Sequence, residues 1–199
     1  MQFDEEGRGF SIMKDGPLDM RMDTSVQMSA KDIIAEMSEK ELGVIFKDLG
    51  EERLWKNAAQ AITRARRRRP ILTTGQLKEV IEEVIPRTGK THPATKIFQA
   101  IRMYVNKELE SIEVSLKKAM QVLAPHGRVS VISFHSLEDR IVKNIFRDAS
   151  QPIRDLRGMD ISAAKIKLIT KKPIACSREE MKKNRRARSA KLRVAEKLH

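Results

Sequence analysis

Apolar residues recur every three or four positions along much of the chain, a period that predicts amphipathic α-helices. Residues 2–27 lack this period and contain glycines and a proline, which indicates loops and turns. Helices are expected over 29–37, 38–50, 52–69, 73–86 and 93–123, the last with a bend near Asn106. Ser38 and Thr73 are each followed three residues later by Glu or Gln, which predicts a capping box at those helix starts.

Three short segments have the pattern of β-strands. Residues 128–134 are mostly apolar and β-branched, so we expect a strand that is buried on both faces. Residues 165–170 alternate between polar and apolar, and residues 189–195 place apolar side chains on one face. Residues 148–164 have the composition of a mobile connection, and residues 182–188 that of a basic loop.

The positive charge of the chain is concentrated outside its first part. The net charge is +13 and the pI about 10.0, which is in the range of nucleic-acid-binding proteins. Residues 1–60 carry a net charge of −5, residues 61–150 carry +8 and residues 151–199 carry +10. Aromatic residues make up only 4% of the chain, which speaks against an RNA-binding sheet that stacks bases on aromatic rings.

The single cysteine, Cys176, excludes an internal disulfide and a cysteine-based metal site. No apolar run approaches the length of a membrane span, and the N-terminal residues lack the pattern of a signal peptide. We therefore expect a soluble cytoplasmic protein, in a reducing compartment and without a metal.

Polar residues cluster directly after the first predicted strand. His135, Ser136, Glu138, Asp139 and Arg140 lie there and lead into an apolar helical run. We expect a helix with Ser136 as its N-cap and Asp139 at the third helical position. Ligands bind open α/β sheets at the carboxyl ends of strands, which favours a functional site. Spacing alone leaves open a well-capped helix whose charges face water.

Two further charged stretches have both a functional and a structural interpretation. Asp15, Asp19 and Asp23 are four positions apart and form either part of a site or an acidic surface loop. The run from Arg64 to Arg69 ends a predicted helix, where cations are favourable electrostatically. Five arginines in six positions exceed what a helix end needs, so we expect phosphate contacts.

Two apparent enzyme motifs are rejected. The Gly89–Thr91 segment has the last residues of a phosphate-binding loop, but Val84 stands where its first glycine belongs and a helix precedes it. Ser133, His135 and Asp139 are the residue types of a hydrolase triad, but the chain has no nucleophile elbow around this serine.

Five stretches, taken in order, resemble a known family. They are Arg8–Ser11 (Arg-Gly-Phe-Ser), Asp15–Asp23 (Asp-Gly-Pro-Leu-Asp-Met-Arg-Met-Asp), His92–Ala100 (His-Pro-Ala-Thr-Lys-Ile-Phe-Gln-Ala), His135–Arg140 (His-Ser-Leu-Glu-Asp-Arg) and Arg186–Val194 (Arg-Ala-Arg-Ser-Ala-Lys-Leu-Arg-Val). Together they resemble the ribosomal RNA cytosine-N4 methyltransferases (RsmH, also called MraW), over a stretch from Gln2 to about Lys197. The resemblance implies S-adenosylmethionine-dependent N4-methylation of a cytosine in small-subunit (16S) ribosomal RNA.

The resemblance implies an α/β fold, the C-terminal part of a Rossmann-like class I methyltransferase fold with an inserted all-helical domain. Residues 1–27 are then a remnant of the methyltransferase domain, residues 28–92 the helical insertion and residues 93–199 the C-terminal half of the methyltransferase domain. Of the sheet, three strands remain, and the last is antiparallel and inserts between the other two. One sheet edge should be exposed, because the strand that normally pairs with it is missing.

The same resemblance implies the site residues. Gln2 falls at a position that contacts S-adenosylmethionine in the family. The candidate catalytic residues are Asp15, Asp19, Asp23, His135, Glu138 and Asp139. The candidate RNA-binding residues are Arg21, Arg64, Arg66, Arg67, Arg68, Arg69, Lys90, Arg140, Arg185, Arg186 and Arg188. We expect the Asp15–Asp23 loop and the His135–Arg140 turn to meet at one site, because in this fold they follow neighbouring parallel strands.

The chain lacks the Gly-rich turn after a first strand with which members of this family begin. It resembles the C-terminal two thirds of a methyltransferase, so we expect weak cofactor binding and no RNA methylation by the chain alone. The alternative is a non-catalytic basic module that binds RNA or the ribosome.

Overall fold

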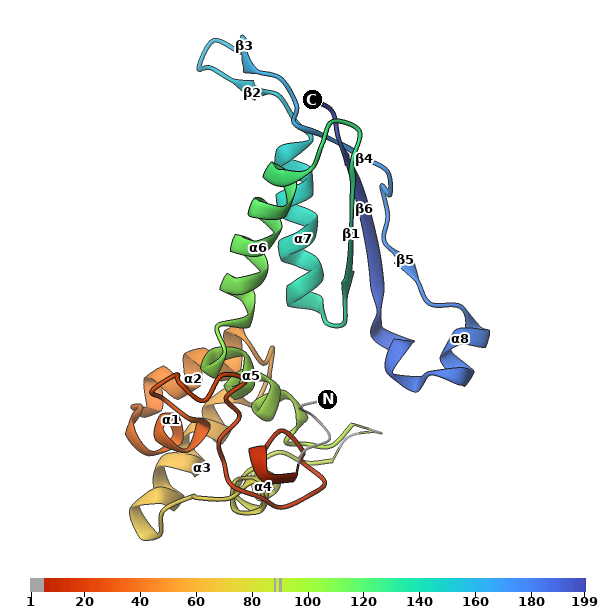
Figure 1. Cartoon of the computed structure of the whole chain (residues 1–199). Helices are drawn as coiled ribbons and strands as arrows, with labels where there is room; N and C mark the ends of the chain where they lie inside the picture. Colours follow the sequence, from red (N-terminus) through yellow and green to blue (C-terminus); the bar gives the residue numbers. More distant parts are fainter. Residues whose placement is uncertain (1–5, 88, 90) are drawn as a thin grey trace. The chain divides into compact units, whose positions relative to one another are not determined.

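The structure, a computed structural model, describes residues 6–87, 89 and 91–199 (Figure 1). The chain divides between Glu108 and Leu109 into two compact units, each of which is described by itself. The predicted domain boundaries at residues 27 and 92 both fall inside the first unit. The three-part division implied by the resemblance therefore stays a prediction.

The first unit is helical, as its apolar period predicts. After a short 3₁₀ helix, η2 (Glu6–Arg8), it contains α1 (Ala30–Glu36), α2 (Glu39–Asp48), α3 (Trp55–Arg68), α4 (Thr74–Glu82) and α5 (Thr95–Val105). Ser38 and Thr73 each form the complete predicted capping box, and Ser29 forms one as well. Helix α3 begins three residues later than expected and ends just before Pro70, which cannot continue a helix.

The core of the first unit includes part of the acidic loop. Leu18 and Met20, from the loop, are 2% and 1% exposed and belong to the same apolar cluster as Ile33, Phe46 and Ile62. The loop is also tied to the segment before α4, since the backbone N–H of Leu18 donates to the carbonyl of Leu72. The Asp15–Asp23 segment is therefore packed into the core of the helical unit, although its sequence shows no helical or strand period.

The helix expected over 93–123 is two helices, and the break falls where the bend was predicted. Helix α5 ends at Val105 with Asn106 as its C-cap, and α6 (Glu108–Val122) starts after Lys107, whose φ is +48°. A positive φ ends an α-helix, because a left-handed residue cannot continue the right-handed hydrogen-bond ladder.

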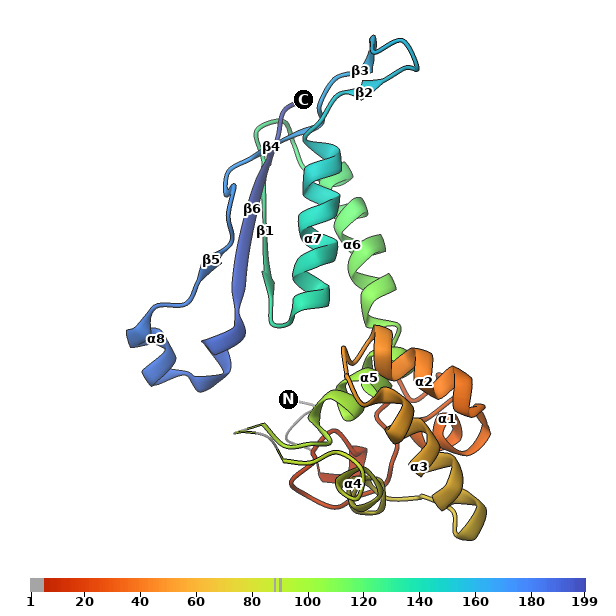
Figure 2. The same ribbon diagram turned by 180° about the vertical axis from the view of Figure 1, so that it is seen from behind.

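The second unit contains the predicted sheet. In its sheet the order is β1 (Arg128–Ser133), β6 (Lys191–Lys197) and β4 (Ile166–Leu168), with β5 (Ile174–Ala175) also paired to β6. Strand β6 is antiparallel to both neighbours, which confirms the expectation of a last strand inserted between the other two. Helices α6 and α7 (Ser136–Ala149) lie side by side along one face of this sheet (Figures 1 and 2).

The expectation that the first strand is buried on both faces is wrong. Val129 and Val131 of β1 pack against the apolar cluster around Val142, but Ile132 on the opposite face is 59% exposed. Phe134, just after the strand, is 52% exposed. An apolar, β-branched run predicts two buried faces, whereas the helices of this unit cover only one face of β1. Among the described residues no strand pairs with the second edge of β1.

Two segments that were expected to be irregular have regular structure. The predicted mobile connection contains the end of α7 and a hairpin of β2 (Ile153–Arg154) and β3 (Asp160–Ser162), which extends beyond the end of α7 in Figure 2. Gly158, with a φ of +81°, supplies its turn. The predicted basic loop contains the end of α8 (Arg178–Lys183) and the 3₁₀ helix η3 (Arg185–Ser189).

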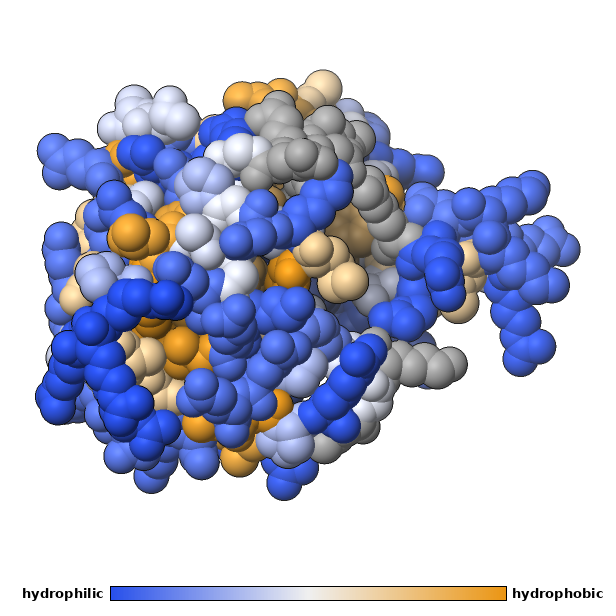
Figure 3. Space-filling view, turned by 90° about the horizontal axis from the view of Figure 1, so that it is seen from below, coloured by the Kyte–Doolittle hydropathy of each residue, from blue (hydrophilic) through white to orange (hydrophobic). Residues whose placement is uncertain are grey.

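Hydrophilic side chains cover most of the face seen in Figure 3, with small apolar areas between them. Within the described part of the chain, no helix combines the length and the apolar character needed to cross a membrane.

Candidate functional site

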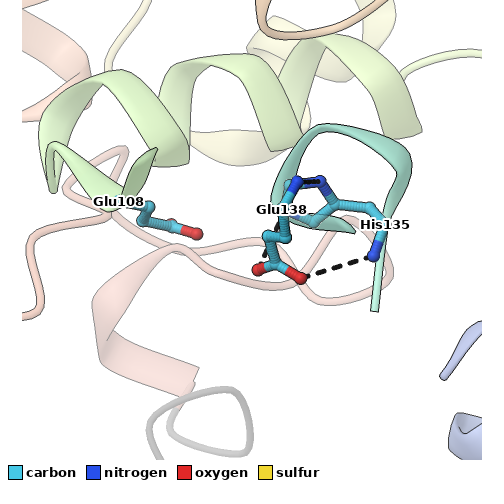
Figure 4. Close-up of side chains that lie close together, drawn as sticks. All are labelled: Glu108, His135 and Glu138. Carbon is cyan, nitrogen blue, oxygen red and sulfur yellow. Dashed lines mark hydrogen bonds and ion pairs between the residues drawn. The ribbon is translucent and has the colours of Figure 1, made fainter. Parts of the chain in front are cut away.

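His135 and Glu138 cap the N-terminus of α7 together (Figure 4). The Nδ1 atom of His135 accepts the backbone N–H of Glu138 at 3.4 Å. The Glu138 Oε2 atom accepts the backbone N–H of Phe134 at 2.7 Å and that of His135 at 3.4 Å. The second imidazole nitrogen, Nε2, lies 3.0 Å from Oε1 of Glu138. The two side chains thus form a capping box in which histidine replaces the usual hydroxyl residue.

The prediction of Ser136 as the N-cap, with Asp139 at the third position, is wrong by one residue. His135 has the extended backbone of a cap (φ −140°, ψ 168°), and Ser136 is already the first helical residue. Serine is the commoner N-cap, which favoured the later register in the sequence. An imidazole nitrogen that accepts a hydrogen bond serves equally, and only the folded backbone distinguishes the two registers.

The environment of Glu138 keeps its carboxyl group ionised. Burial raises the pKa of Glu138, but hydrogen bonds from His135 and from the Phe134 backbone outweigh burial and hold the pKa below its usual value. An ionised carboxylate at a helix N-terminus also interacts favourably with the helix dipole. Glu138 can therefore act as a hydrogen-bond acceptor at neutral pH.

Asp139 faces the sheet and is paired with two cations of β6. Its Oδ1 accepts Nε–H of Arg193 at 2.7 Å, and its Oδ2 accepts Nη2–H of Arg193 and Nζ–H of Lys191, both at 3.2 Å. The hydrogen bonds from Arg193 lower the pKa of Asp139. Asp139 and Arg193 are both buried, at 7% exposed each. This predicted catalytic residue anchors the start of α7 to the central strand.

Asp15 closes the N-terminus of α4. Its Oδ1 accepts the backbone N–H groups of Gly75 at 2.7 Å and of Gly16 at 2.9 Å, and the hydroxyl of Thr74 at 3.3 Å. The hydrogen bond from Gly75 is the main cause of its lowered pKa. A Cβ atom at position 75 would come within 2.9 Å of this carboxyl group, so the contact requires glycine.

Asp19 and Asp23 are bound within their own loop. Asp19 accepts Nε–H and Nη2–H of Arg21, both at 2.8 Å, and these bonds lower its pKa. Arg21 donates further to the carbonyls of Thr24 and Val26, at 3.1 and 2.8 Å. Asp23 accepts the backbone N–H and the hydroxyl of Ser25 at 2.9 and 2.8 Å. Arg21, a predicted RNA-binding residue, thus holds the loop closed.

Asn106 holds the Asp15–Asp23 loop in place, a role that no sequence motif indicates. Its Oδ1 accepts the backbone N–H of Met22 at 2.6 Å, and its Nδ2 donates to the carbonyls of Met20 and Arg102, both at 2.8 Å. Met20 has a φ of +61°, so the loop turns sharply between these two anchors. The one clue to this role in the sequence is that an amide side chain, which can both donate and accept hydrogen bonds, lies at the predicted bend of the helix.

The Arg8–Ser11 stretch, which contributed to the resemblance, supports the same loop. The Nη2 atom of Arg8 donates to the carbonyls of Arg21 at 2.7 Å and Met22 at 2.9 Å. Gly9 has a φ of +70°, and a Cβ atom there would lie 2.2 Å from the carbonyl oxygen of Pro17. Only glycine permits this close approach of the two segments.

Most of the predicted RNA-binding arginines are exposed, whereas Arg66 is half-buried and hydrogen-bonded. Arg64, Arg67, Arg68 and Arg69 are exposed at the end of α3, and Arg140, Arg185 and Arg188 are exposed in the second unit. Arg66 is half-buried, and its Nη1 donates to the carbonyl of Ile34 at 2.5 Å. Gln2 and Lys90 lie outside the described residues, and the side chain of Arg186 is also not described.

The predicted site residues therefore form two sets. Asp15, Asp19 and Asp23 share one loop of the first unit, while His135, Glu138 and Asp139 share the first turn of α7 in the second. The expectation that the two motifs meet stays a prediction, because each unit is described by itself. So do the assigned roles of these residues and the expected lack of a metal.

The sequence of the chain matches the MraW methylase family over residues 1–198. It is 49% identical over 197 residues to a protein of Elusimicrobium minutum (strain Pei191) named ribosomal RNA small subunit methyltransferase H. It is 50% identical over 205 residues to a protein of the same name from Brevibacillus brevis (strain 47 / JCM 6285 / NBRC 100599). Both matches cover 99% of this chain, which spans 64% and 65% of the lengths of these relatives. The chain belongs to the MraW methylase family.

Proposed function

We propose that the chain serves the N4-methylation of a cytosine in small-subunit ribosomal RNA, with S-adenosylmethionine as the methyl donor. The observation that carries this proposal is the family match over residues 1–198, together with relatives that are named small-subunit ribosomal RNA methyltransferases. The inserted antiparallel last strand supports it, since the resemblance implied this arrangement before the fold was known.

The chemistry of the reaction defines what the side chains must do. The amino nitrogen of cytosine is a poor nucleophile because its lone pair is delocalised into the ring. S-adenosylmethionine supplies an electrophilic methyl group on a positively charged sulfur, and Gln2, outside the described residues, is the contact that the resemblance assigns to it. The other residues must hold the amine in line and accept its hydrogens, since positioning contributes much of the rate.

Among the five candidate carboxylates, Glu138 and Asp23 fit this role better than the others. Asp19 and Asp139 are each bonded to a guanidinium, and Asp15 caps a helix. The bonds to Asp23 come from Ser25, and those to Glu138 come from its own capping turn. Hydrogen bonds from Ser25 lower the pKa of Asp23, and the pKa of Glu138 is also lowered. Both carboxylates are therefore ionised acceptors at neutral pH.

The proposal requires the Asp15–Asp23 loop and the His135–Arg140 turn to act on the same base. This requirement is tested by placing single cysteines at positions 23 and 136, with Cys176 replaced by serine, and measuring cross-linking by short bifunctional reagents. A cross-link between these positions in the RNA-bound protein is expected. Its absence, when cysteines placed within one unit at a similar separation do cross-link, would contradict the shared site.

The reaction itself is tested with small ribosomal subunits and S-adenosylmethionine carrying a labelled methyl group. Three proteins are compared: the 199-residue chain, the Elusimicrobium minutum relative, and a chimera of the chain with the part of that relative that it does not match. We expect the chimera to label cytosine N4 and the chain alone not to do so. A chimera that is folded and binds RNA but transfers no methyl group would favour the alternative, a non-catalytic RNA-binding module, for which the net charge of +13 is also suited.

A further inference from the structure

A small hollow lies in the first unit beside the arginine-rich end of α3. Its volume is about 270 Å³, just below the range of about 300–1000 Å³ for pockets that hold drug-sized molecules. Ile34, Pro70, Ile71 and Leu72 give it apolar walls, and Ala35 of α1 borders it without filling it. Leu72 is 50% exposed, so part of this apolar wall is open to solvent.

Two cations stand beside these apolar walls. Lys31 extends from α1 and Arg66 from α3, and both line the hollow. Arg66 is fixed in place because it donates to the carbonyl of Ile34. Next to it, Arg67, Arg68 and Arg69 are exposed, so the local charge is strongly positive. Lys31 lies 4.0 Å from Oδ1 of Asp32, whose Oδ2 accepts the hydrogen bonds of the Ser29 capping box.

This combination suits one unstacked nucleotide of a single-stranded RNA. A base offers a flat apolar face, and its phosphate offers a negative charge a few ångströms away. Proteins bind splayed bases against apolar or aromatic side chains and against guanidinium planes, with cations on the backbone. Arg66 provides an anchored guanidinium. Lys31 provides an exposed cation, and a phosphate would share it with Asp32 or replace Asp32 as its partner.

We propose that this hollow holds an unstacked base of the RNA substrate, at a position other than the methylated cytosine. The inference rests on the proposed function for the nature of the RNA. None of the candidate catalytic carboxylates lines the hollow, so a base held there is not the reacting one. The hollow anchors the strand, and the exposed arginines of α3 hold its phosphates.

The experiment uses the 199-residue chain and an oligouridine that carries one 2-aminopurine, whose fluorescence reports stacking. Ala35→Phe fills the hollow without changing the charge, and its control is Val44→Phe at an exposed position of α2. Lys31→Gln removes the exposed cation of α1, and its control is Lys40→Gln at an exposed position of α2. Circular dichroism verifies that each variant is folded, and a duplex with the same label distinguishes base insertion from phosphate contact.

We expect Ala35→Phe to weaken binding of the single strand by about fivefold or more and to remove the change in 2-aminopurine fluorescence, since a lost stacking site has at least this effect. Duplex binding should be unchanged. Lys31→Gln should weaken the single strand more than Lys40→Gln does. A folded Ala35→Phe variant that binds the single strand like Val44→Phe would overturn the proposal that the hollow holds a base, and would leave the proposed function untouched. Failure of the parent chain to bind any RNA would overturn both this inference and the RNA partner of the proposed function.

Discussion

Asp139 and Arg193, which are 54 positions apart in the sequence, form a buried two-armed ion pair between the first turn of α7 and the central strand β6. Both belong to stretches that carried the family resemblance. Because β6 lies between β1 and β4, the pair fixes the helix that bears His135 and Glu138 to the middle of the sheet. Asp139, a predicted catalytic residue, thus holds the helix next to the candidate site in position.

Replacing Asp139 by Asn should destabilise the second unit by about 3 kcal/mol, because it leaves the Arg193 cation buried without its partner. Trp55 and Tyr104 both lie in the first unit, so their fluorescence does not report on unfolding of the second unit. Hydrogen exchange of α7 and β6 is therefore the suitable measurement. The control is Glu196→Gln, which breaks the ion pair with the exposed Arg128 on the same sheet and should have a smaller effect. Equal effects of the two variants would contradict the importance of burial.

The Asp139 pair should also make stability depend on pH. The hydrogen bonds from Arg193 lower the pKa of folded Asp139 below its ordinary value of 3.8. The stabilisation is therefore complete well above pH 3.8 and is lost as the pH falls through that value towards the folded pKa. The difference in unfolding free energy between the parent and Asp139→Asn should be constant near neutral pH and shrink in acid. A difference that stays constant down to the lowest pH at which both are folded would exclude this linkage.

The capping role of His135 predicts a contrast between two substitutions. His135→Ala removes the acceptor for the Glu138 backbone N–H and should cost about 1 kcal/mol. His135→Asn keeps an acceptor at the N-cap and should cost little. Hydrogen exchange at the first turn of α7 measures both. If Asn preserves the helix but abolishes methylation by the chimera, His135 has a further role at the site; if both properties survive, its role is the cap.

Asn106 should control the order of the acidic loop. Asn106→Ala leaves the backbone groups of Met20 and Met22 without their side-chain partners, at a cost of about 1–3 kcal/mol. We expect faster hydrogen exchange over residues 18–23. Asn57→Ala, an exposed substitution of the same type on α3, serves as the control. Unchanged exchange in the loop would show that Arg8 and the buried Leu18 hold it by themselves.

The exposed arginines of α3 should contribute to RNA binding through phosphates. Replacing Arg64, Arg67, Arg68 and Arg69 by Gln, while keeping Arg66 for its structural bond, should weaken binding and reduce its salt dependence. The log–log slope should fall by about 0.7–0.9 for each lost contact. The control removes four cations elsewhere in the same unit: Lys40, Lys47, Lys56 and Lys78. An equal change in slope in both variants would mean that only the net charge matters.

Most helices and strands of this protein follow from local sequence patterns. The apolar period located the helices of the first unit, and Ser38 and Thr73 marked two of their starts, because capping depends on residues within one turn. The family resemblance supplied the place of β6 between two strands that are distant in the chain. The sequence also predicted the bend near Asn106. It did not predict the positive φ of Lys107 or the contacts of Asn106 with Met20 and Met22.

The partners of the charged residues, by contrast, depend on contacts that form only in the folded chain. Asp15, Asp19 and Asp139 have the same side chain, yet they bind a helix N-terminus, a neighbouring arginine and a distant strand. With His135 as the cap, Asp139 is the fourth residue of α7, and its carboxylate binds Arg193 of β6. A carboxylate binds whichever donors the folded backbone brings within about 3 Å, and local sequence does not specify donors that are more than 50 positions away.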